Sequence, residues 1–155
     1  MMSEIQHLLD LMDRTWAGDA WHGPSVHQAL EGCTAAEAAQ RPLANAHTIH
    51  ELAEHMIVWQ EAVRRWLAGE EFKVTPEMDW PTIADSGEAA WADTRARMDT
   101  SHAALRAAIA AFPDARLGEP RAPGKMPWYA VLQATVHHDL YHTGQIAMLR
   151  KATRK

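Results

Sequence analysis

The sequence predicts an all-α protein built as a four-helix bundle. Four long segments carry apolar residues at three- and four-residue steps, the spacing that places side chains along one face of a helix. Segments with the alternating pattern of a strand are few. The chain of 155 residues is of ordinary size for one domain, so we expect a single helical-bundle domain over residues 1–155.

The first long helix is predicted to begin at Ser3, which opens a capping box with Gln6. Gly18 is expected to end it. Glycine and proline then interrupt residues 21–43, but two further capping boxes begin at Ser25 and Thr34. We therefore expect two short helices in a long crossover between the first and second long helices. The apolar face of the first helix consists of Ile5, Leu8, Leu9, Met12 and Trp16.

The second long helix is predicted from Thr48, which opens a fourth capping box, to Gly69 as its C-cap. Residues 70–85 contain two prolines and should form a loop, with a short strand or turn at residues 72–74. A third helix is expected over residues 86–111 and a last helix over residues 127–150. The connections are long enough to run the length of the bundle, so the order of the helices stays open. The apolar stripe of the second helix is Leu52, Met56, Trp59, Val63 and Trp66.

Composition excludes several classes of protein. Hydrophobic residues make up 47% and charged residues 23%, values that argue against disorder. A net charge of -5 gives no reason to expect nucleic acid, and the basic run at residues 150–155 should be a solvated helix end. Cys33 is the single cysteine, so no intrachain disulfide can form. The N-terminus lacks signal-peptide features and no run approaches ~20 apolar residues, so we expect a soluble cytoplasmic protein.

The last helix carries the pair His138 and His142. Four residues return a helix to within ~40° of its starting direction, so both imidazoles project from one face and could share an ion. They lie on the face expected to turn inward, where His138, His142 and Gln145 occupy successive core positions. A buried polar group without a partner costs about 1 to 3 kcal/mol, so these three need an explanation. His55, inside the apolar stripe of the second helix, would complete a three-histidine metal site.

Other interpretations remain open. Histidines also pack in cores with one ring nitrogen hydrogen-bonded, and His102 is the best substitute if His55 is not the third ligand. His50 and His137 should lie on the surface or beside the ligands. Asp139 replaces the glutamate of the zincin motif HExxH, which disfavours a metalloprotease.

No catalytic side chain is assigned, because the reacting group would be a metal-bound water or thiolate. Asp139 is expected to be a solvated acid or to lie just behind the ligands, and Gln145 could orient a ligand or a bound water. Gly144 would leave room for a close helix or for a ligand above the ion. The aromatic residues that could line a pocket are Trp59, Trp128 and Tyr141.

Three sequence features match a known family: His55-x-x-x-Trp59-Gln60, His138-Asp139-x-Tyr141-His142-x-Gly144-Gln145 and the Gly-Pro-Ser of residues 23–25. On these features the sequence resembles the DinB/YfiT-like family of four-helix-bundle metalloproteins over nearly its whole length. The resemblance implies a divalent ion, commonly zinc or nickel, bound by three histidines, and a homodimer. Members of the family include thiol S-transferases that use bacillithiol or mycothiol, a maleylpyruvate isomerase and proposed hydrolases.

We therefore expect a metal-dependent enzyme acting on a small molecule, either thiol S-transferase-like or hydrolase-like. The alternative is a non-catalytic dimeric metal-binding or stress-linked bundle, which a closed four-ligand site including His102 would favour. A second partly apolar face of the last helix is expected to form the dimer interface. That face consists of Leu132, Val136, Leu140 and Ala147.

Overall fold

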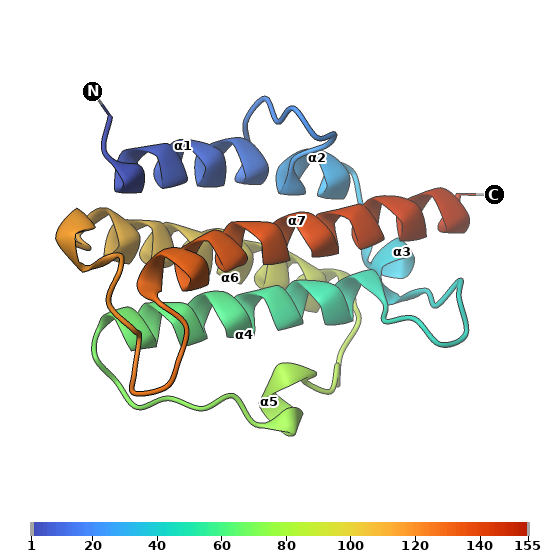
Figure 1. Ribbon diagram of the computed structural model, residues 1–155. Coiled ribbons are helices and arrows are strands. Elements are labelled where there is room, and N and C mark those ends of the chain that lie inside the picture. Colours follow the sequence, from blue (N-terminus) through green and yellow to red (C-terminus); the bar gives the residue numbers. More distant parts are fainter. Residues whose placement is uncertain (1, 155) are drawn as a thin grey trace.

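The computed structural model describes residues 2–154, and within them every regular element is a helix (Figure 1). The prediction of an all-α four-helix bundle is confirmed. Three short α-helices and one 3-10 turn lie in the connections between the long helices. The long helices are α1 (Glu4–Trp16), α4 (Ile49–Leu67), α6 (Glu88–Ala110) and α7 (Trp128–Thr153). The short elements are α2 (Val26–Leu30), α3 (Ala35–Ala39), α5 (Pro76–Asp79) and η1 (Asp114–Arg116).

The directions of the helices settle the order that the sequence left open. In Figure 1, α1 and α7 run one way along the bundle, whereas α4 and α6 run the other way. Because α4 and α6 are parallel neighbours, the connection between them returns along the whole bundle. Helix α4 packs against both α6 and α7, and α1 packs against the same two helices from the other side. The antiparallel pair of α4 and α7 carries the polar residues singled out in the sequence.

Local capping explains where α1, α2, α3 and α4 begin. Ser3, Ser25, Thr34 and Thr48 each accept a hydrogen bond from the backbone three residues later, and the residue at that position returns the bond. These are the four capping boxes that the sequence predicts. Gly69 follows the last turn of α4 with φ at 82°, a conformation that glycine adopts without strain.

Two connecting segments differ from the expectation. Residues 72–74 form no strand, and instead Pro76 begins α5 after Thr75, whose side chain accepts from the Met78 N–H. Arg150 is not part of a solvated helix end, because it is buried and donates to the carbonyl oxygens of Ala29 and Glu31. The last carbonyl groups of a helix lack hydrogen-bond partners within the helix, and Arg150 supplies donors to these groups at the C-terminal end of α2. Lys155 lies outside the described residues.

The core consists of two clusters along the bundle axis. One packs α4, α6 and α7 around Met56, Met98 and Ile146. The other packs α1 onto α6 and α7 and includes Leu132 and Val136, which are 0% and 5% exposed. The apolar face expected to form a dimer interface is therefore largely used inside the chain. Burying such side chains contributes about 1.5–3 kcal/mol each.

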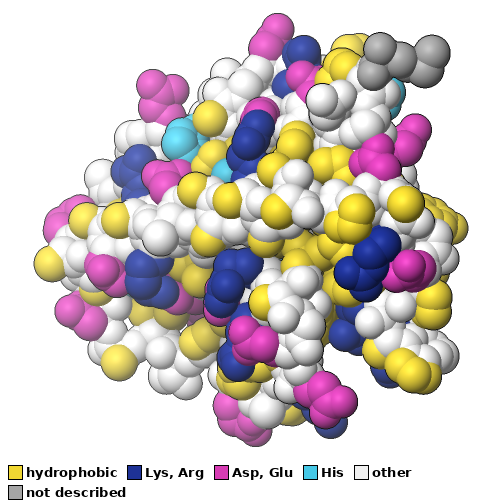
Figure 2. Space-filling view, turned by 90° about the vertical axis from the view of Figure 1, so that its left-hand side faces the viewer, with side chains coloured by type: hydrophobic (Ala, Val, Ile, Leu, Met, Phe, Trp, Pro, Cys, Tyr) yellow, Lys and Arg dark blue, Asp and Glu magenta, His cyan; other side chains and the backbone are white. Residues whose placement is uncertain are grey.

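The charges visible on the end face of the bundle are mixed. Figure 2 shows Lys and Arg interspersed with Asp and Glu there, rather than gathered in one basic area. None of the helices within residues 2–154 combines the length and the apolar character needed to cross a membrane.

Candidate metal centre

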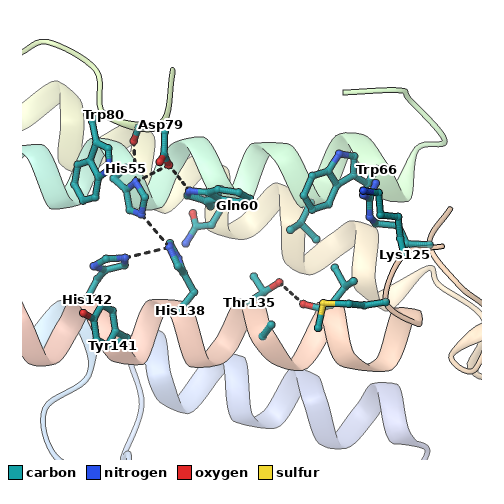
Figure 3. A pocket seen from close by; sticks show the side chains of 16 residues that line it. His55, Gln60, Trp66, Asp79, Trp80, Lys125, Thr135, His138, Tyr141 and His142 are labelled. Carbon is teal, nitrogen blue, oxygen red and sulfur yellow. Dashed lines mark hydrogen bonds and ion pairs between the residues drawn. The ribbon is translucent and has the colours of Figure 1, made fainter. Parts of the chain in front are cut away.

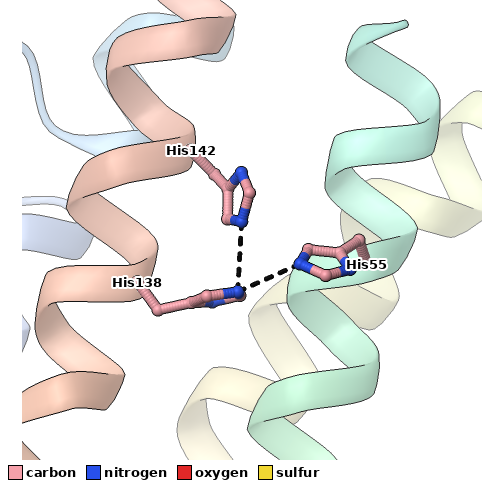
Figure 4. Close-up of side chains that lie close together, drawn as sticks. All are labelled: His55, His138 and His142. Atoms are coloured by element: carbon pink, nitrogen blue, oxygen red, sulfur yellow. Dashed lines mark hydrogen bonds between the residues drawn. The ribbon is translucent and has the colours of Figure 1, made fainter. Parts of the chain in front are cut away.

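Three histidines from two antiparallel helices converge in the structure (Figure 4). His55 on α4 and His142 on α7 place their Nε2 atoms 3.0 Å and 3.1 Å from the Nε2 atom of His138. One nitrogen from each ring lies within 4.8 Å of the others, which defines a possible metal-binding group. The structure thus brings together the three histidines that the sequence singled out. Their role as ligands stays a prediction.

Packing of the apolar stripe brings His55 to the other two. Leu52 and Met56 on α4 are 2% and 0% exposed, and they hold this part of the helix against the core. His55 lies between them in sequence, so its ring leaves α4 close to the same face. On α7 the four-residue step places His138 and His142 one turn apart. Contact between α4 and α7 then closes the three-histidine cluster.

Hydrogen bonds at the far side of two rings determine which nitrogen is free. The Nδ1 atom of His55 lies 2.7 Å from the carbonyl oxygen of Asp79 and 3.1 Å from its carboxylate. Both oxygens can only accept, so Nδ1 carries the proton and Nε2 presents a lone pair. The Nδ1 atom of His142 likewise donates to Oε1 of Gln145 at 2.7 Å. The expectation that Gln145 orients a ligand agrees with this contact.

Burial keeps these rings neutral. It lowers the pKa of His55 and of His142, and it lowers the pKa of His138 to about 3, with the two neighbouring imidazoles adding to the effect. With Nδ1 protonated, His55 and His142 both direct Nε2 lone pairs at the Nε2 atom of His138. That atom has at most one proton to donate, so at least one of the two contacts is repulsive. A cation between them would turn this repulsion into attraction, and imidazole nitrogens are common ligands for zinc and nickel. The residues present therefore fit a divalent metal ion.

The ring of His55 is also held by a segment that the sequence did not single out. Helix α5 brings Asp79 and Trp80 over α4 (Figure 3). Trp80 stacks on His55 at 4.0 Å between ring centres, and its ring also stacks on His47 at 3.4 Å. The Asp79 carboxylate also accepts a bond from the indole N–H of Trp59 at 2.7 Å. Thr75-Pro76, a cap followed by proline, was the available signal for this helix.

A cavity of about 580 Å³ opens beside the histidines (Figure 3). All three line it, together with Trp59 and Tyr141, two of the aromatic residues named from the sequence. The third, Trp128, lies elsewhere, in the core against Phe112. Most of the remaining lining residues are apolar, and the volume is in the range of small-molecule sites.

A comparison with protein families agrees with this geometry. The model of a family described as the DinB superfamily matches residues 20–146, which include all three histidines. The chain belongs to the DinB superfamily. A search of the curated proteins found no match.

The other histidines of this DinB superfamily member do not join the cluster. His102 is buried and stacks on Trp16 at 4.0 Å, and burial lowers its pKa to about 4. Two positions were expected for His50, at the surface or beside the ligands; it is 3% exposed with its Nε2 atom 2.9 Å from the hydroxyl of Thr94, so the surface position is wrong. His137 is exposed, as predicted.

The structure also decides between alternatives for Asp139 and Gly144, and it restricts the chemistry of Cys33. Asp139 is not solvated: it is 3% exposed, accepts a bond from Gln60, and its pKa is raised by burial to about 7. Gly144 makes no room for a close helix, because a Cβ there would meet nothing within 4 Å. Burial raises the pKa of Cys33 to about 11, so its thiol stays protonated at neutral pH.

Proposed function

We propose that the protein is a divalent-metal-dependent enzyme that acts on a small molecule through thiol S-transferase-like chemistry. His55, His138 and His142 would hold the ion, and zinc or nickel suits three imidazole nitrogens. The observation that carries this proposal is the position of the three nitrogens at the wall of a cavity of about 580 Å³. A ligand in that cavity could therefore approach an ion held by the three nitrogens.

The ion would supply Lewis acidity, which favours a thiolate over a thiol and so prepares a sulfur nucleophile at neutral pH. The chain itself would position the reactants. Asp79 and Gln145 fix the rings of His55 and His142 through their Nδ1 atoms. Trp59 and Tyr141 line the cavity beside them and would exclude water from the organic part of a substrate. The same site could promote attack by water, so hydrolase-like chemistry is the second candidate.

The alternative is a non-catalytic metal-binding or stress-linked protein. Structural ions are usually enclosed by four protein ligands. The fourth ligand considered from the sequence, His102, is stacked on Trp16 instead. Within residues 2–154 the only group of metal-binding type contains three histidines and no fourth donor. This arrangement favours an enzyme over a structural site.

The proposal also includes a homodimer in the cytoplasm. Tyr141 and Met148 on α7 are 65% and 66% exposed, and exposed apolar side chains of this kind mark interfaces. We expect light scattering at tens of micromolar protein to give twice the mass of the chain. A monomeric mass at that concentration would exclude the dimer.

The test of function combines elemental analysis with a screen for thiol-dependent consumption of electrophiles. In the expected reaction with an aryl halide, the sulfur forms a bond to carbon, halide leaves and the thiol proton passes to solvent. Turnover should require both the ion and a small thiol and should stop when a chelator removes the ion. Turnover that continues unchanged without thiol would reject the transferase and support the hydrolase. Bound metal without any turnover would favour the non-catalytic protein.

A further inference from the structure

The charged residues that line the cavity are separated between its two ends. Asp79 is the only acidic residue of the lining and lies at the histidine end, where His55 and Trp59 use its oxygens. The lining has two basic residues, Arg121 and Lys125, both from the connection that leads into α7. In Figure 3, Lys125 and Trp66 lie at the end opposite the histidines. The metal centre and these cations therefore face the same space from opposite ends.

The length of the cavity follows from the helix that forms its wall. Trp66 is eleven residues beyond His55 on α4, which is about 16 Å along the helix axis. The guanidinium carbon of Arg121 lies 4.1 Å from the centre of the Trp66 ring. Allowing for a bond to the ion and a contact to arginine, a ligand that touches both ends needs about 10 Å between its reacting atom and its far group.

Arg121 is held in place without a charged partner. Its guanidinium stacks on Trp66, and the backbone N–H of Arg121 donates to the Met126 carbonyl at 2.9 Å. A second backbone bond, from the Lys125 N–H to the Ala122 carbonyl at 2.9 Å, closes the loop. Within residues 2–154 neither Arg121 nor Lys125 forms an ion pair.

Two acidic residues beside this end form no ion pair with the two cations within the described chain. Glu70 and Glu71 line an adjoining cavity that also contacts Arg121 and Lys125. Glu70 is bound to Arg65 at 2.6 Å, and Glu71 forms no ion pair within the described chain. The two positive charges are thus available to a ligand, and an arginine that is fixed by stacking is well suited to bind an anionic group.

We propose that the cavity selects a ligand with an apolar body and an acidic group at the end remote from the metal centre, which Arg121 and Lys125 bind. The apolar body would lie along Trp59, Val63 and Val131, which form the walls between the two ends. A carboxylate, sulfonate or phosphate would meet the requirement of the far end. The inference rests on the proposed function only in assigning the near end of the ligand to the ion.

The test uses ligands that differ only in charge. An extended chain of eight carbons spans about 10 Å, so 8-mercaptooctanoic acid and its amide are matched probes for the metal-loaded protein. Calorimetry should show about tenfold tighter binding of the acid, because hydrogen bonds between charged groups are stronger than neutral ones. The preference should decrease at high salt, since Lys125 is exposed and its charge is screened. Equal affinity of the two probes would overturn the proposal.

Variants separate a local binding site from overall charge. The double variant Arg121→Gln with Lys125→Gln should bind acid and amide equally, whereas Arg121→Lys, which keeps the charge but loses the stack on Trp66, should keep part of the preference. Lys151→Gln is the control, because Lys151 is an exposed lysine on α7 that does not line the cavity. If Lys151→Gln lost the preference as fully as the double variant, net charge rather than these residues would be responsible, and the proposal would be wrong.

Octanoate and octanamide, which contain no sulfur, distinguish this inference from the proposed function. In the metal-free protein their binding reports the cations alone, because no ion is present to bind the carboxylate, and octanoate should bind more tightly than octanamide there. Preference for octanoate without any metal-dependent turnover would leave the anion site standing and reject the enzyme. Metal- and thiol-dependent turnover without any preference for the acid would support the enzyme and reject the anion site.

Discussion

Replacing His55, His138 or His142 with alanine is expected to abolish stoichiometric binding of the metal ion. Each change would leave two imidazole nitrogens, too few for the tight site that three converging Nε2 atoms would form. The ion binds the folded chain, so binding also stabilises the fold. At an ion concentration about 100 times the dissociation constant this stabilisation is about 2.7 kcal/mol. The readouts are elemental analysis and the shift in melting temperature on adding the ion.

Matched controls come from histidines outside the cluster. His137→Ala should keep both the ion and its stabilising effect, because His137 is exposed. His102→Ala and His50→Ala should also keep the ion, although both remove buried rings and should lower the stability of the metal-free protein. The quantity to compare between variants is therefore the shift in melting temperature on adding the ion, rather than the melting temperature itself. If His55→Ala retained stoichiometric metal and His102→Ala lost it, the third ligand would be His102 rather than His55.

Gln145→Leu is expected to weaken metal binding by about 10- to 100-fold, the usual cost of losing a partner that orients a ligand. The Oε1 atom of Gln145 accepts the Nδ1 proton of His142 at 2.7 Å and so keeps Nε2 free for the ion. Leucine is similar in size but accepts no hydrogen bond. The imidazole would then be free to rotate or to carry its proton on Nε2. Competition with a chelator of known affinity measures the change.

Two companion variants define the cause of that loss. Gln145→Glu keeps an acceptor at the same position, so it should bind metal at least as tightly as the unchanged protein. Gln133→Leu makes the same substitution at an exposed position of α7 and should have no effect on affinity. Unchanged affinity in Gln145→Leu would show that the contact with His142 does not orient the ligand.

The start of each capped helix could be predicted because it depends on neighbours in the chain. At Ser3 and Thr48 the cap and its partner are three residues apart, so the bonds form wherever the segment lies. The pairing of His138 with His142 is local for the same reason. Predicting His55 as the third candidate required one more argument, namely that it lies in the apolar stripe of its helix. That stripe faces the bundle interior, as expected. These features, with the DinB-like motifs, determined the fold class and the three candidate ligands.

The remaining features depend on which elements pack together. Asp79 and Trp80 could not be placed beside His55 from sequence, because their segment returns along the bundle before α5 reaches α4. For Asp139 and His50 the sequence left open a solvated position or one behind the ligands. Helical periodicity gives the direction of a side chain but not how deeply neighbouring helices cover it. Both are buried because α4, α6 and α7 pack closely. Local hydrogen bonds and periodicity are therefore encoded over a few residues, whereas burial and the orientation of His55 depend on contacts between segments that are distant in the chain.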